Sequence, residues 1–63
     1  MDPNATWDDI QAAIYEGQAH EAVAPLEDLI EWIKKGGFPP DIFKTSDSPL
    51  YFLGLLKEAC RQA

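Results

Sequence analysis

The chain has 63 residues and a formal net charge of −6, with one cysteine and one histidine. A domain of this length buries only about 60% of the surface that its unfolded chain exposes, so its stability as a monomer is marginal. The single cysteine excludes an internal disulfide, and one Cys with one His cannot supply the four ligands of a structural zinc site. We therefore expect a single domain, residues 1–63, that is stabilised by packing and by self-association.

The charge is divided unevenly along the chain. Residues 1–33 contain eight acidic residues and no Lys or Arg, whereas residues 34–63 contain all five basic residues and three acidic ones. An acidic half disfavours direct binding to nucleic acid and to anionic membrane surfaces, which both require clustered positive charge. It favours a basic protein partner, or the more basic half of a second copy.

No targeting or membrane segment is expected. The N-terminal sequence MDPNATWDD is acidic and polar, unlike the start of a secretory signal. The longest apolar run, PLYFLGLL, is far shorter than the ~20 residues of a membrane helix. Together with the lone cysteine, these features predict a cytoplasmic protein without membrane contact.

The first predicted helix covers about 6–16. Thr6 is a candidate N-cap, Asp9 lies in the capping-box position three residues later, and Gly17 is a natural stop. The apolar residues at helical spacing are Trp7, Ile10, Ala13 and Ile14.

The second predicted helix covers about 19–35, and its apolar residues fall within an arc of about 120°. Pro25 lies inside this pattern, where proline removes one backbone hydrogen bond and clashes with the carbonyl of Glu21. Because the apolar stripe stays in phase through Pro25, we favour one kinked helix. The alternative is a second helix that starts at Pro25. Gly36 and Gly37 end the helix.

The segment WDDIQAAIYEGQAHEAV resembles the helical hairpin of a tetratricopeptide repeat. The residues that carry the resemblance are Trp7, Ile10, Ile14, Gly17, Ala22 and Val23. The match covers roughly residues 7–30, in one copy, and Gln11 stands where the repeat usually has glycine. The resemblance implies an antiparallel hairpin and nothing about partners.

Residues 36–47 form a Gly/Pro-rich loop of about twelve residues, which is long for a compact domain. Phe38, Ile42 and Phe43 lie within it. One interpretation is that these three side chains cover one end of the helical core. The other is that they form an apolar patch for a partner.

The third predicted helix covers about 49–61, with Ser48 as N-cap and Pro49 at the first helical position. Its apolar residues surround most of the helix, so one groove cannot bury both Leu50 and Tyr51. Overall, the pattern predicts a small all-α domain: an antiparallel hairpin, the Gly/Pro-rich loop, and a C-terminal helix.

The sequence offers little catalytic chemistry. His20 lies on a polar face near carboxylates, which is typical of a solvated histidine, and Glu27 and Glu31 point outward on the predicted helix. Cys60 lies on the apolar stripe and is expected to be a buried thiol. We expect no catalytic residues, no metal site and no cofactor.

The preferred function is therefore a protein–protein interaction module that binds itself or another, basic protein. A two-fold dimer through the third helix and the 38–43 loop would cover the excess apolar surface. The predicted apolar contact residues are Trp32, Phe38, Ile42, Phe43, Leu50 and Tyr51. The alternative is an acidic inhibitor or nucleic-acid mimic that occupies a basic groove of an enzyme through Glu27, Asp28 and Glu31.

Overall fold

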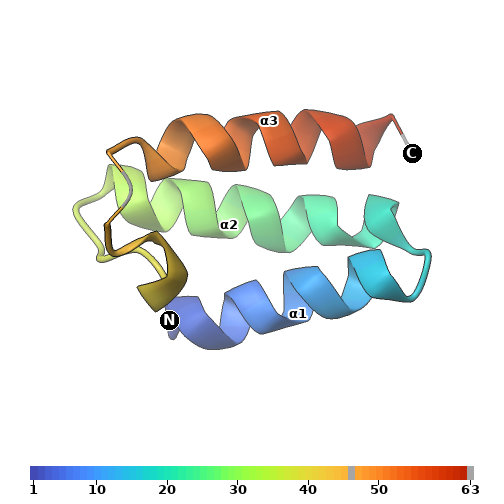
Figure 1. Cartoon of the computed structure of the whole chain (residues 1–63), viewed down its shortest axis with the longest axis horizontal. Helices are drawn as coiled ribbons and strands as arrows, with labels where there is room; N and C mark the ends of the chain where they lie inside the picture. The colour runs from blue at the N-terminus through green and yellow to red at the C-terminus, as the bar shows by residue number, and fades with distance from the viewer. Residues whose placement is uncertain (46, 63) are drawn as a thin grey trace.

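The computed structural model describes residues 1–45 and 47–62, and over these residues the chain is all-α (Figure 1). Helix α1 spans Pro3–Tyr15, α2 spans Val23–Lys34 and α3 spans Pro49–Arg61. Two short 3-10 helices, η1 (Ala19–Ala22) and η2 (Asp41–Phe43), precede α2 and α3. Helix α2 runs back along α1, and α3 runs back along α2 (Figure 1). The predicted antiparallel hairpin with a C-terminal helix is confirmed.

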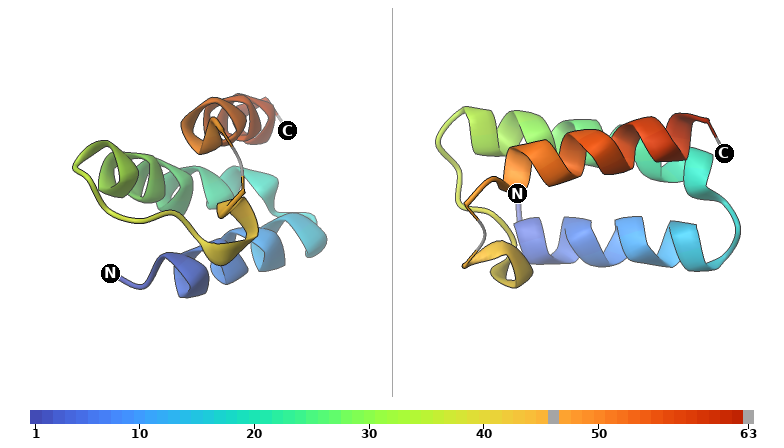
Figure 2. Two further views of the ribbon diagram at one scale, coloured as in Figure 1. Left: turned by 60° about the vertical axis from the view of Figure 1, so that its left-hand side comes forward. Right: turned by 45° about the horizontal axis from the view of Figure 1, so that its top comes forward.

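Helix α2 is the central element. Both α1 and α3 pack against α2 and η1, and they make few contacts with each other. In the left view of Figure 2, the three helices stand at the corners of a triangle, and the segment 36–45 crosses one end of it. This arrangement leaves a broad side of α3 without a neighbouring helix.

Helix α1 begins earlier than predicted, because Asp2 rather than Thr6 is its N-cap. Oδ1 of Asp2 accepts hydrogen bonds from the backbone N–H groups of Asn4 at 3.0 Å and Ala5 at 3.3 Å. Pro3 occupies the first helical position, where its missing N–H is no loss. The prediction of Thr6 and Asp9 as a capping box is therefore wrong, and the Asp-Pro pair was the stronger start signal.

Both helices of the hairpin end in a glycine with positive φ. Gly17 has φ 76°, and its successor Gln18 donates its backbone N–H to the Ala13 carbonyl oxygen at 2.9 Å. Gly36, with φ 98°, follows α2 in the same way. This Schellman arrangement satisfies carbonyl groups that would otherwise lack partners, and it favours glycine because other residues are strained at positive φ. The predicted stops at Gly17 and Gly36 are confirmed.

Pro25 lies in the first turn of α2, as its third residue. The predicted single kinked helix from 19 to 35 is therefore replaced by η1 followed by α2. The start at Val23 lies two residues before the start at Pro25 that the alternative expected. The same physical reason allows a helix to start at Val23 or at Pro25. The first N–H groups of a helix have no intrahelical acceptor, so proline in the first turn costs no helical hydrogen bond.

The core takes a small number of residues from every element. It consists of Ile10, Ala22, Leu26, Leu29, Phe43, Leu53 and Cys60. The buried position of the Cys60 thiol confirms its assignment to the apolar stripe. With so few buried side chains, each one carries a large share of the hydrophobic stabilisation.

The 36–47 connection divides its three large apolar residues between core and surface. Phe43 is only 8% exposed and packs edge-on against Trp7, with ring centroids 5.1 Å apart. Phe38 and Ile42 are exposed. Phe43 thus covers one end of the core, and it leaves little surface for a partner because it is already buried within the chain.

A side-chain bond fixes η2 against α1. Oδ1 of Asn4 accepts a hydrogen bond from the backbone N–H of Asp41 at 2.8 Å. The two residues are 37 positions apart in the sequence. This bond joins the loop to the start of α1 directly before Phe43 enters the core.

Candidate interaction surface

Three large, exposed apolar side chains lie together on α3. Tyr51 is 71% exposed, Leu55 55% and Phe52 47%. Their spacing of one and four residues places them on one side of the helix, and the exposed Ala59 continues that side one turn further. We call these four residues, Tyr51, Phe52, Leu55 and Ala59, the α3 stripe.

The opposite side of α3 explains why the stripe is exposed. Leu53 and Cys60 are buried against the rest of the domain, and Leu56 packs partly against the core. Two neighbouring elements can cover only about half of a helix, so a helix that is apolar nearly all round must present the remainder to solvent.

Sequence reasoning found Tyr51 but not Phe52 or Leu55. The apolar arc on α3 is wider than one groove can bury. This width was the signal that some of its residues, such as Phe52 and Leu55, would be exposed. The direction from which the other two helices approach α3 decides which part of that arc is covered, and this direction is not encoded in the periodicity of α3 alone.

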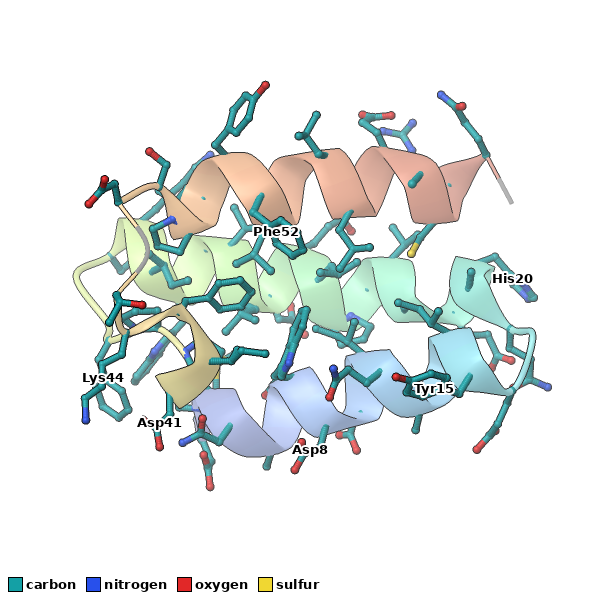
Figure 3. All side chains as sticks on the ribbon, viewed as in Figure 1. Asp8, Tyr15, His20, Asp41, Lys44 and Phe52 are labelled. Carbon is teal, nitrogen blue, oxygen red and sulfur yellow. The ribbon has the colours of Figure 1, made fainter. Side chains whose placement is uncertain are left out.

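Phe52 is held in place by aromatic packing. Its ring lies 5.4 Å from that of Phe43, and Phe43 in turn contacts Trp7. Figure 3 shows Phe52 on the side of α3 that is turned toward the lower layers of the domain in that view. The stripe therefore has one edge anchored in the core, and its Phe52 ring loses little freedom when a partner covers it.

The other predicted apolar contacts differ from Tyr51 in exposure or in the element that carries them. Leu50 is half-buried, and Ile42 is exposed on η2, which is bonded to the start of α1. Trp32 is half-buried, and its Nε1–H donates to the Phe38 carbonyl oxygen at 3.0 Å. The predicted dimer contact through both α3 and the loop stays a prediction.

The acidic residues Glu27, Asp28 and Glu31 of α2 are all exposed. Glu31 forms an ion pair with Lys35 at 3.2 Å, in which both side chains are more than 60% exposed. Exposed pairs of this kind contribute only about 0–1 kcal/mol to stability. The predicted acidic surface exists, but lysines lie directly beside it.

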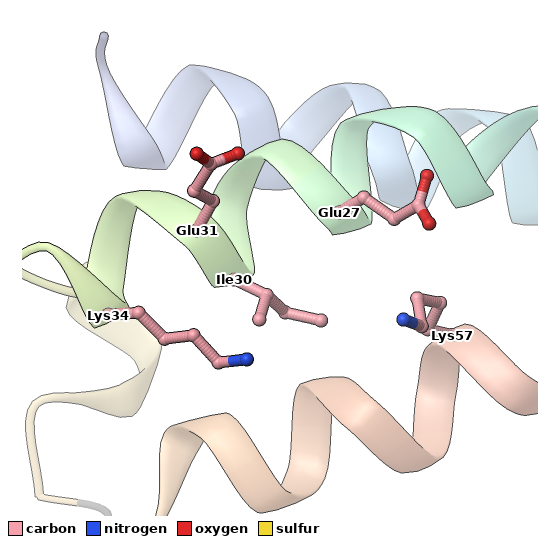
Figure 4. Close-up of a pocket in the computed structure, with 5 residues that line it drawn as sticks. All are labelled: Glu27, Ile30, Glu31, Lys34 and Lys57. Atoms are coloured by element: carbon pink, nitrogen blue, oxygen red, sulfur yellow. The ribbon is translucent and has the colours of Figure 1, made fainter.

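A shallow groove of about 290 Å³ lies between α2 and α3. Glu27, Ile30 and Glu31 line it from α2, together with Lys34, and Lys57 lines it from α3 (Figure 4). Two carboxylates and two ammonium groups cancel in formal charge around one isoleucine. The five lining residues include no thiol, hydroxyl or imidazole group.

The remaining chemical candidates differ in their exposure to solvent. His20 is exposed on η1 at the turn of the hairpin (Figure 3), whereas Cys60 is buried. Within residues 1–45 and 47–62, no group of three or more His, Cys, Asp or Glu side chains is placed to hold a metal ion. Over the same residues, none of the helices combines the length and the apolar character that crossing a membrane requires.

Comparison with protein-family models, with curated proteins and with solved structures found no match for this chain. The tetratricopeptide-like hairpin is therefore a local resemblance of residues 7–30.

Proposed function

We propose that this protein is a small protein–protein interaction module that associates with itself and has no catalytic activity. The observation that carries the proposal is the α3 stripe: Tyr51, Phe52 and Leu55 leave about half or more of their surface in water. A 63-residue domain buries little apolar surface in its core. Three large apolar side chains left in water are therefore costly unless a partner covers them. Aromatic residues are also enriched at interface centres.

A second consideration supports an apolar contact over a catalytic role. The groove between α2 and α3 is open and balanced in charge. Enzyme sites usually combine a concave pocket with a few convergent polar groups, and the groove lacks that concentration.

The alternative function is an acidic inhibitor or nucleic-acid mimic that acts through Glu27, Asp28 and Glu31. The net charge of −6 supports it. The three lysines next to these acids, Lys34, Lys35 and Lys57, weaken the negative field that a basic groove would recognise. We therefore rank it second.

Sedimentation velocity at micromolar and at millimolar protein concentration tests the proposed function. Self-association predicts a sedimentation coefficient that rises with concentration toward that of a dimer. A monomer at both concentrations would remove the proposal of self-association.

A further inference from the structure

We draw no further inference here: the strongest candidate, the exposed apolar side of α3 that carries Tyr51, Phe52 and Leu55, supports none beyond the proposed function because nothing in the structure shows what covers it.

Discussion

The indole of Trp32 lies directly over Gly37, and this contact joins the end of α2 to the loop that follows. A Cβ atom built on Gly37 would lie 2.6 Å from Trp32 Cδ2 and closer still to Cε2 and Nε1. The same indole donates a hydrogen bond to the Phe38 carbonyl oxygen, and its ring meets that of Phe38 edge-on at 6.1 Å. Glycine is therefore required at position 37 because the Trp32 indole occupies the place of a Cβ atom, and not because of the backbone angles of Gly37.

Gly37→Ala is expected to destabilise the domain by about 1–3 kcal/mol, because the added methyl forces the half-buried indole out of place. Thermal unfolding at micromolar concentration measures the change. Gly54→Ala is the matched control: among the described residues nothing lies within 4 Å of its added Cβ, so the substitution should stabilise α3 by up to about 1 kcal/mol through helix propensity. Equal effects of both substitutions would contradict the assigned role of Trp32.

Asp2→Ala is expected to cost about 1 kcal/mol, since it removes the side-chain oxygen that caps α1. Asp9→Ala is the control, because Asp9 is exposed and outside the observed cap. Urea denaturation of both variants measures the difference. If Asp9→Ala were the more damaging of the two, the cap would lie at Thr6 after all.

Phe43→Ala is expected to cost about 3 kcal/mol or more, because it removes a buried ring that contacts both Trp7 and Phe52. Its neighbour Ile42, exposed on the same 3-10 helix, should tolerate Ile42→Ala with a change below about 1 kcal/mol. Chemical denaturation monitored by tryptophan fluorescence compares the two. If Ile42→Ala lowered the free energy of unfolding as much as Phe43→Ala, the loop would cover the core differently.

Added salt is expected to strengthen self-association. Each copy carries −6, so a dimer brings together −12, and screening reduces that repulsion while an apolar contact through α3 is retained. Sedimentation at low and high salt measures the trend. Dissociation by salt would indicate an interface made by opposite charges, such as the acidic half of one copy on the basic half of another.

Much of the fold could be predicted from the sequence, because its signals are local. Gly17 and Gly36 mark the ends of α1 and α2, Pro49 marks the start of α3, and the boundaries of α3 match those observed. The sequence predicted one kinked helix around Pro25, whereas the structure has η1 followed by α2. The apolar residues keep the same helical spacing in both cases, so the spacing cannot distinguish one helix from two consecutive ones.

The surface was harder to predict than the fold. Nothing in the sequence distinguishes Phe43 from Phe52 as apolar residues, yet Phe43 is buried and Phe52 is nearly half exposed. Their difference depends on how the loop and α3 pack against the rest of the domain, which is a property of tertiary packing. Tyr51 could be identified because it lies farthest from the buried side of α3.

Dilution of an isotopically labelled sample, followed by amide NMR, tests the central claim most directly. Between millimolar and micromolar concentration, the account predicts that the shifting amides cluster on α3 around Tyr51, Leu55 and Ala59, while the acidic outer side of α2 stays unchanged. Shifts confined to α1 and α2, or no shifts at all, would contradict it.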